Sequence, residues 1–232
     1  MSRIAIYADL HGNIPALRAF EEDLKKRRVD GLWCLGDIVG KGPDSDVTCD
    51  WAREHSDLIL QGNWDSGIGF KEYSADHYYW NQLGEERMAF LRSLPLEKTV
   101  TVSGRKLRLF HGRPVMKPLL FIQSSAEQFE PYFADGAEIL IWADAHRAGM
   151  RLAGQGMQVV NCGSVGNGLG LNQVQYCIME GDLDCEKRTP IAFTFITLDY
   201  DSEAAAKRAL ETELPHREEY AEEVRTGRYC RD

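Results

Sequence analysis

Short apolar segments alternate with amphipathic segments over the first 63 residues of the chain. Residues 3–9, RIAIYAD, are apolar and partly β-branched, which is typical of a buried strand. Residues 14–29 place Leu17, Phe20 and Leu24 at helical spacing, with charged side chains between them. The same pattern predicts a strand at 31–37, a helix at 44–56 and a strand at 57–63. Because alternating strands and helices favour parallel pairing, we expect the loops to gather at the carboxyl ends of the strands.

The rest of the chain is predicted to be richer in strands. A helix over 78–93 ends before Pro95, and residues 98–112 form a hairpin that turns at Ser103 and Gly104. The pattern also predicts a helix near 124–134, strands at 137–144, 157–166, 174–182 and 193–201, and helices at 202–214 and 216–227. The glycine-rich segment 163–173 is the one expected flexible loop or lid. Because we find no repeat or linker, we predict a single domain over 1–232 that includes the closing helices within 202–227.

Composition and charge narrow the classes of function. The formal net charge of −9 excludes a general nucleic-acid or acidic-membrane binder, which would carry a basic face. It leaves phosphorylated ligands open, because bound metal ions reverse the local field. No apolar run reaches the ~18 residues of a membrane helix, and the start of the chain lacks a signal sequence, so we expect a cytoplasmic protein. The six cysteines form no C-x-x-C pair and are expected to be reduced and mostly buried.

Polar side chains able to bind a metal occur where several predicted strands end. They are Asp9 and His11 at the first strand, Asp37 at the second, Asn63 at the third, His111 at the hairpin, and Asp144 and His146 at the strand 137–144. Each alone could be a turn former, a helix cap or a hydrogen-bonded histidine. Together they present seven oxygen and nitrogen donors at the crevice where open α/β sheets bind ligands. Such a set suits divalent cations of borderline hardness, such as Mn, Fe, Zn or Co.

The order of these segments resembles the calcineurin-like metallophosphoesterase superfamily, especially its small bacterial and archaeal phosphodiesterase branch. ADLHGN, GDIVGKGPD and QGNWD resemble the family's D-x-H-G-N, G-D-x-V-G-x-G-P and G-N-H-D blocks. FHGRP, ADAH and NCGSVG resemble its strand-end histidine block, its G-H-x-H block and its N-P-G-S-V-G block. The similarity runs from about residue 3 to residue 167. It implies an α/β fold of the four-layer αββα type, in which two mixed sheets are flanked by helices and a two-metal site lies at the sheet edges.

The resemblance also implies a role for each strand-end residue. Asp9, His11 and His146 would hold a first metal, Asp37 would bridge both metals, and Asn63, His111 and Asp144 would hold the second. Asp37, Asn63 and His111 would then carry catalysis. A bridging carboxylate can hold two ions roughly 3.5–4 Å apart, and a bridging hydroxide becomes nucleophilic near neutral pH. We expect two divalent cations, with manganese or iron favoured and zinc, nickel or cobalt as alternatives.

Two positions at or next to the expected metal ligands depart from the family pattern. Asp144 stands where histidine is usual; it either ligates as a harder, more anionic group, which favours Mn or Fe over Zn, or points away from a weakened second site. Trp64 stands where G-N-H-D has its histidine. Indole has only an N–H donor and does not titrate, so Trp64 cannot act as a general acid, and activated leaving groups are favoured. Trp64 either stacks on a substrate ring or packs at the rim, and Asp65 is expected only to support a turn.

Four further side chains lie in or near these blocks. Arg113 is the candidate phosphate clamp, with Arg147 as the second choice, because guanidinium pairs with phosphate in bidentate fashion. Lys41 is read as a solvated lysine rather than a substrate contact. Cys162, in the position of the family's proline, is read as a buried thiol rather than a nucleophile.

These residues indicate a metal-dependent phosphoesterase that hydrolyses phosphodiesters or nucleotide-type esters in preference to monoesters. The alternative is a metal-binding scaffold or sensor with little catalytic activity, for which Trp64 and Asp144 are the evidence. A metal-free nucleotide-binding module is disfavoured, because DLHGN has one glycine where G-x-G-x-x-G needs three. The expected partner is a small phosphoester or nucleotide, with no membrane and no general nucleic-acid binding, and a homodimer is left open.

Overall fold

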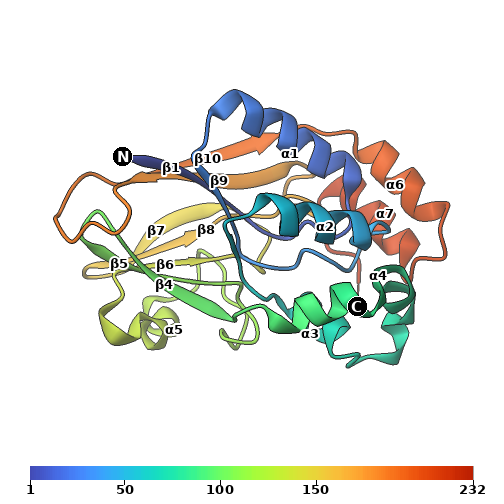
Figure 1. The fold of residues 1–232 in the computed structure, drawn as a ribbon, viewed down its shortest axis with the longest axis horizontal. Helices are drawn as coiled ribbons and strands as arrows, with labels where there is room; N and C mark the ends of the chain where they lie inside the picture. Colours follow the sequence, from blue (N-terminus) through green and yellow to red (C-terminus); the bar gives the residue numbers. More distant parts are fainter. Residues whose placement is uncertain (232) are drawn as a thin grey trace.

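The computed structural model describes residues 1–231, and its centre consists of two mixed sheets of five strands each (Figure 1). The first sheet contains, in spatial order, β10 (Ala192–Leu198), β9 (Val174–Gly181), β1 (Ser2–Tyr7), β2 (Gly31–Cys34) and β3 (Leu58–Ile59). The second contains β4 (Glu97–Val102), β5 (Arg105–Phe110), β6 (Ile139–Trp142), β8 (Met157–Asn161) and β7 (Gly149–Gly154). The expected parallel pairing holds for β1, β2 and β3, with Ile6 opposite Trp33 and Cys34 opposite Ile59.

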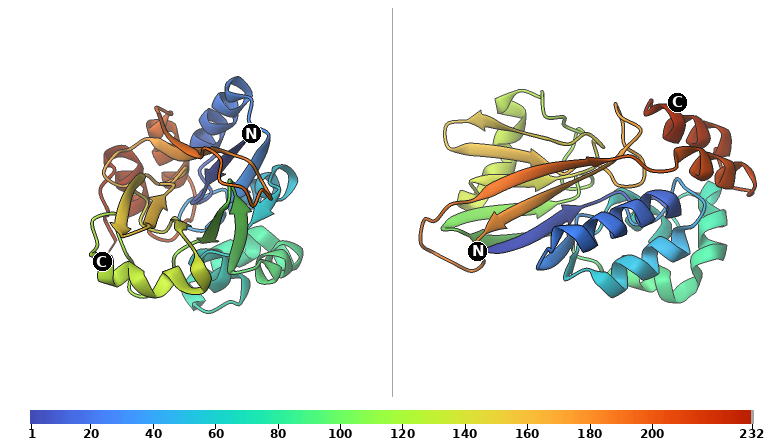
Figure 2. Two further views of the ribbon diagram at one scale, coloured as in Figure 1. Left: turned by 90° about the vertical axis from the view of Figure 1, so that its left-hand side faces the viewer. Right: turned by 90° about the horizontal axis from the view of Figure 1, so that it is seen from above.

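Helices cover the outer face of each sheet. The first sheet is covered by α1 (Ile14–Arg27), α2 (Ser45–His55), α4 (His77–Ser93), α6 (Ser202–Leu210) and α7 (Arg217–Thr226). The second sheet is covered by the short α5 (Ala126–Phe129) and the following 3-10 helix η2 (Glu130–Gly136). Figure 2 shows α1 and α2 on one side of the sheets and the α5 region on the other. This is the four-layer αββα arrangement that the sequence resemblance implies.

Three apolar clusters hold the layers together. Between the sheets, Ile6 and Leu35 of the first sheet pack with Leu109 and Ile141 of the second. Outside the first sheet, Phe20 of α1 lies within 5.0 Å of the Tyr7 ring, and α6 and α7 belong to the same cluster. Outside the second sheet, Trp142 and Phe110 pack with Phe129 of α5. Burial of both faces explains why β1 and β6 read as continuous apolar runs.

The segment after β3 differs from the prediction. A strand was expected over 57–63, but β3 has only two residues and helix α3 (Asn63–Gly69) begins at Asn63. The backbone of Gly62 is extended, and the Asp65 carboxylate accepts the N–H of Gly62 at 2.9 Å, which caps the new helix. A seven-residue segment with two glycines has low helix propensity, so this side-chain cap decides the structure.

Two other expectations were incomplete. The edge strand β7 was not predicted, because glycines bound it and Leu152 within it is 71% exposed, so it lacks a buried apolar run. The glycine-rich segment 163–173 was expected to be flexible, but its residues 163–168 are buried. Asn13 donates to the Gly166 carbonyl at 2.7 Å while its Oδ1 caps α1 through the Ala16 N–H. The segment is therefore anchored to the first loop.

The described part of the chain has no helix with both the length and the apolar content needed to span a membrane. All six cysteines are free thiols, and four of them are buried, as expected. Burial raises the pKa of Cys162, which agrees with its reading as a buried thiol rather than a nucleophile.

Phe20→Ala is expected to lower the free energy of unfolding by about 3–5 kcal/mol, because it leaves a cavity against Tyr7 and Tyr176. Phe70→Ala is the matched control, since Phe70 is 55% exposed, and it is expected to change that free energy by less than about 1 kcal/mol. Urea denaturation of the two variants measures both values. Equal destabilisation would contradict the placement of Phe20 in the core.

Candidate metal centre

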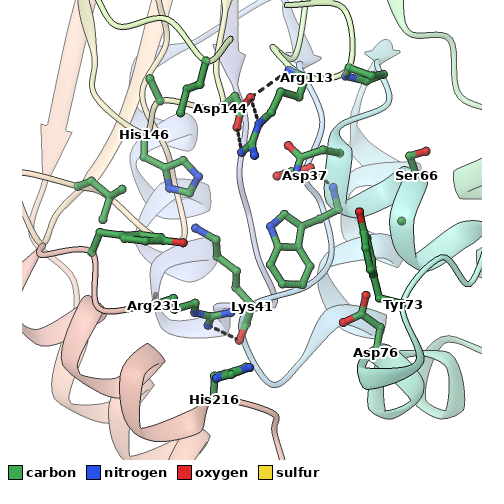
Figure 3. A pocket seen from close by; sticks show the side chains of 18 of the residues that line it. Asp37, Lys41, Ser66, Tyr73, Asp76, Arg113, Asp144, His146, His216 and Arg231 are labelled. Atoms are coloured by element: carbon green, nitrogen blue, oxygen red, sulfur yellow. Dashed lines mark hydrogen bonds and ion pairs between the residues drawn. The ribbon is translucent and has the colours of Figure 1, made fainter. Parts of the chain in front are cut away.

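The predicted strand-end residues meet at one end of the two sheets. Asp9 and His11 follow β1, Asp37 follows β2, Asn63 starts α3 after β3, His111 follows β5, and Asp144 and His146 follow β6. Strands β1, β2 and β3 are parallel in the first sheet, and β5 and β6 are parallel in the second. The two sheets pack against each other, so the carboxyl ends of these strands face a common volume. Figure 3 shows Asp37, Asp144 and His146 around the same cavity.

Five of these residues form two overlapping clusters whose candidate ligand atoms lie within 4.8 Å of one another. The first cluster is Asp9, His11 and His146; the second is Asp9, Asp37 and His111. Asp9 Oδ1 lies 3.3 Å from His146 Nε2 and 3.7 Å from His11 Nε2. Asp37 Oδ2 lies 3.2 Å from His111 Nε2 and 3.7 Å from His11 Nε2. Asp9 therefore lies close to His11 and His146, and Asp37 lies close to His11 and His111.

Most of the polar atoms that face this volume have no protein partner. Both carboxylate oxygens of Asp9, Nε2 of His11, Nε2 of His111 and Oδ1 of Asn63 are buried without a hydrogen bond. Buried polar groups are normally paired, because desolvation without a partner is costly. Four residues thus place five buried oxygen and nitrogen atoms without hydrogen-bond partners in one volume, as a cation-binding site requires. The residues present are thus suitable for a divalent metal centre.

Each histidine is oriented by a backbone carbonyl. Nδ1 of His11 lies 3.1 Å from the carbonyl of Val39, and Nδ1 of His111 lies 2.9 Å from that of Leu35. Nδ1 of His146 lies 2.6 Å from the carbonyl of Asn167. Since a carbonyl only accepts, the proton of each neutral ring sits on Nδ1, and the Nε2 lone pair is directed to the centre. Such outer contacts are what fixes metal-ligating histidines in proteins.

The backbone of the site is unusual. Asp9, His11, Asp37, Asp144 and His146 all have positive φ, between 46° and 60°. Residues other than glycine rarely adopt this left-handed region, although Asp and His tolerate it better than most. Each such residue turns sharply as its strand ends, which directs the side chain back across the sheet edge. Local strain of this kind is concentrated at functional sites, where surrounding contacts hold it.

Burial and mutual charge shift the pKa values within the centre. Burial lowers the pKa of His11 and of His146, with the Lys41 charge adding to the effect, so both rings are neutral. Burial raises the pKa of Asp9. Burial would also lower the pKa of His111, but the Asp37 charge outweighs it and raises that pKa to about 10. A cation at the His111 lone pair would compete with this proton.

Asp65 does more than support a turn. It is fully buried, and its carboxylate accepts the backbone N–H groups of Asp37 at 2.8 Å, Ile38 at 3.0 Å and Gly62 at 2.9 Å. The backbone N–H of Trp64 in turn donates to Asp37 Oδ1 at 2.8 Å. A Cβ atom on Gly62 would lie 2.1 Å from that same oxygen, so only glycine fits there. Asp65 therefore joins the loops after β2 and β3 and fixes Asp37.

Asp144 lies outside both clusters. Its Oδ2 accepts the backbone N–H of Arg113 at 2.9 Å and Nε at 2.8 Å, and its Oδ1 accepts Nη2 at 2.6 Å (Figure 3). Burial would raise the pKa of Asp144, but the Arg113 guanidinium outweighs it and holds that pKa at about 2. The arrangement favours the alternative in which Asp144 is directed away from the second metal position. Arg113, the candidate phosphate clamp, is correspondingly engaged with a carboxylate.

A cavity of about 1310 Å³ opens beside the centre. Asp37, Asn63, Trp64, Arg113 and Arg147 line it, as do Lys41, Tyr73, Tyr229 and Arg231. The interpretation of Lys41 as a solvated lysine is wrong, because Lys41 is only 6% exposed. Burial lowers the pKa of Lys41, while nearby carboxylates, chiefly Glu223, raise it. The cavity could hold a substrate much larger than a phosphate group.

The Trp64 ring packs at the rim and also faces the cavity. Its ring centroid lies 6.1 Å from that of His11 and 6.1 Å from that of Tyr79. A Cβ atom on Gly40 would lie 2.3 Å from the indole, so the ring rests directly on the Gly40 backbone. Packing therefore fixes the Trp64 ring at the rim, and because the residue lines the cavity, its stacking on a ligand stays a prediction.

Two residues that support the site from a distance were missed by the sequence analysis. Asn167 binds His146 through its carbonyl, and its side chain contacts both Lys41 and Glu223. Glu223 of α7 is fully buried. Asn167 lies in a glycine-rich segment, and Glu223 lies in a helix whose sequence is typical of a solvent-exposed helix. Only their contact in the folded structure identifies them as supporting residues. Asp65 could have been found by its place in the G-N-H-D block.

Comparison with known proteins identifies the family of this chain and relatives with the same fold. Residues 2–184 match the calcineurin-like phosphoesterase superfamily domain. An uncharacterized protein of Methanocaldococcus jannaschii is 28% identical, and the alignment covers 92% of this chain and 94% of that protein. A metallophosphoesterase from Sphaerobacter thermophilus has a similar structure, with a TM-score of 0.75, 23% identity and coverage of 97% of this chain and 99% of that chain.

A hypothetical protein from Pyrococcus horikoshii is similar over 100% of both chains, with a TM-score of 0.77 and 20% identity. At these identities the two structural matches establish the fold alone. The family match extends over most of the chain and includes every residue of the candidate metal centre. The chain therefore belongs to the calcineurin-like phosphoesterase superfamily.

Proposed function

We propose that the protein is a metal-dependent phosphoesterase that hydrolyses phosphodiesters or nucleotide-type phosphoesters with activated leaving groups. The single observation that carries this proposal is the set of five buried, unpaired polar atoms at the ends of the strands. Asp9, His11 and His146 would hold one divalent cation. Asp37 would be shared with a second cation held by His111 and Asn63.

Bound divalent cations would supply a nucleophile at neutral pH and stabilise charge on the phosphoryl oxygens. The chain's own residues would orient the substrate. Asn63 presents a buried amide oxygen to the centre, and Asp37 is fixed by the backbone contacts that Asp65 organises. Arg113 also lines the cavity, where Asp144 holds its guanidinium in a fixed orientation, so this pair adds little net charge. Manganese or iron remains the expected metal, because the donors are oxygen and imidazole nitrogen.

Protonation of the leaving group is the weak step in this arrangement. Trp64 occupies the position of the motif histidine and lines the cavity, but its indole N–H does not titrate. The leaving groups of phosphoanhydrides and of esters of acidic alcohols or phenols depart without a proton donor. The site therefore favours these substrates over alkyl phosphate monoesters.

A second candidate function is a metal-binding scaffold or sensor. It is favoured by the hydrogen bonds that engage the expected ligand Asp144 with Arg113, and by the absence of a titrating side chain at position 64. It predicts bound metal without turnover above that of free metal. Hydrolysis of bis(p-nitrophenyl) phosphate separates the two functions.

Manganese is expected to stabilise the folded protein, because it would offset the buried Asp9 carboxylate. At a hundred times its dissociation constant a ligand adds about 2.7 kcal/mol to the free energy of unfolding, which is a shift in Tm of roughly 5–10 °C for a chain of this size. Asp9→Asn is expected to abolish the shift, and Glu54→Gln, an exposed control on α2, to retain it. Differential scanning calorimetry with and without Mn²⁺ provides the measurement; an unchanged shift in Asp9→Asn would refute the site.

Asp37→Asn is expected to lower kcat/KM for bis(p-nitrophenyl) phosphate at least a hundredfold, roughly the upper end of the loss seen for changed metal surroundings. The physical reason is that the Asp37 carboxylate lies between His11 and His111. The assay is run in Mn²⁺ with the Glu54→Gln variant alongside. Activity that survives the Asp37 substitution would exclude a shared carboxylate.

Trp64→His is expected to raise hydrolysis of an alkyl phosphate by up to about 10²-fold, within the range of general acid catalysis. Hydrolysis of the aryl diester should change little, because its leaving group needs no proton. Trp64→Phe is the control, since it keeps a ring on Gly40 but adds no titrating group. An equal response of both substrates would show that Trp64 acts through packing or ligand geometry.

A further inference from the structure

A buried lysine lies at the side of the cavity next to the candidate metal centre. Lys41 is 6% exposed, and its side chain is directed into the cavity in Figure 3. Its Nζ donates to Asn167 Oδ1 at 3.2 Å, a neutral partner. Among the described residues no carboxylate lies within ion-pair distance of that Nζ. Lysine is rarely buried without a counter-charge, so this ammonium group is directed at space that an anion could fill.

A second cation lies against the same lysine. Arg231 has a side chain that is 10% exposed, and its Nη2 donates to the Lys41 carbonyl at 3.4 Å. Its guanidinium carbon lies 5.9 Å from the centre of the Trp64 ring. Arg231 Nε is 3.7 Å from Glu223 but makes no hydrogen bond. Figure 3 shows Lys41 and Arg231 together, on the other side of the cavity from the Arg113–Asp144 pair.

Segment 228–231, which carries Arg231, is held in place by α7. Glu223 Oε1 accepts the Cys230 N–H at 3.2 Å, and its Oε2 accepts Asn167 Nδ2 at 3.2 Å. Glu223 is thus shared between the segment and the loop that positions Lys41. Glu223 lies within ion-pair distance of Arg231 but not of Lys41, so the Lys41 ammonium group lacks a direct ionic partner among the described residues, although Glu72, Asp76 and Glu219 also line the cavity.

The two cations are close to the centre but separate from it. The Trp64 ring contacts His11 at 6.1 Å on one side and the Arg231 guanidinium at 5.9 Å on another. A single side chain therefore separates this wall from a metal-ligating histidine. Tyr229 and Tyr73, both more than 60% exposed, line the same cavity and offer rings on which a base could stack.

We propose that Lys41 and Arg231 form an anion subsite that binds a second phosphate of the substrate, one beyond the phosphoryl group at the metal centre. The expected substrates are then nucleotides with at least two phosphates. This assignment of the substrate class rests on the proposed function. Guanidinium and ammonium groups in a partly desolvated pocket are the usual partners of phosphate oxygens. Segment 228–231 is then a specificity element, because it delivers one of the two cations.

Binding of ADP and of adenosine, measured by isothermal titration calorimetry in EDTA, tests the subsite without any hydrolysis. The unaltered chain is expected to bind ADP at least about tenfold more tightly than adenosine, as one to two charge-assisted hydrogen bonds allow. Lys41→Met and Arg231→Met should each remove most of this difference. Arg228→Met is the matched control: Arg228 is exposed in the same segment, lies outside the cavity lining and carries the same charge.

Lys41→Arg should retain the preference for ADP, which distinguishes loss of charge from misfolding of a buried position. Equal binding of ADP and adenosine by the unaltered chain would overturn the subsite. An equal loss in Arg228→Met would also overturn it, because general attraction would then explain the effect. Hydrolysis of bis(p-nitrophenyl) phosphate in Mn²⁺ decides the proposed function separately, so failure of the subsite and failure of catalysis give different results.

Discussion

Five ionisable side chains, Asp9, Asp37, His11, His111 and His146, are buried in one small volume at the ends of two sheets. Neither carboxylate oxygen of Asp9 has a hydrogen bond, and its nearest neighbours are imidazole nitrogens. Such an arrangement is unfavourable in a folded protein unless a cation compensates it. Most other features of the site can be understood as consequences of holding these groups together.

The surrounding structure holds the five groups by rigid contacts. Each imidazole is anchored to a backbone carbonyl, and positive φ angles turn the strand ends toward the centre. Asp65 collects three backbone N–H groups from two loops, which fixes the position of Asp37. Asn167 and Glu223 extend this network to α7 and segment 228–231. A helix that lies beyond the matched family region thereby contributes to the geometry of the centre.

Positive charge near the centre is carried by Arg113, Lys41 and Arg231. Asp144 adds a carboxylate, and Arg113 binds it, so that pair is nearly neutral. Trp64 removes a titrating group, while Lys41 and Arg231 supply fixed cations close to the same ring. A protein with a net charge of −9 thus presents basic groups in the cavity beside its candidate metal centre. That contrast is expected for a site that selects small anionic ligands while the outer surface repels polyanions.

The sequence alone determined the alternating strands and helices, the parallel pairing of β1 to β3 and the polar residues at the strand ends. These features depend on local periodicity and on short blocks such as ADLHGN, so they can be read from neighbouring positions. Helix α3 could not be read in this way, because the Asp65 cap outweighs the low helix propensity of NWDSGIG. Edge strand β7 lacked a buried face to mark it.

Only the tertiary structure decided how the site residues are used. Asp144 could ligate or turn away, and its carboxylate binds the Arg113 guanidinium, 31 positions earlier in the chain. Lys41 read as a solvated residue because nothing near it in sequence covers it, whereas Asn167 and segment 228–231 bury it. Burial and ion pairing arise between segments distant in the chain, so no local pattern encodes them. The types of donor in the site were therefore readable from the sequence, but their partners were not.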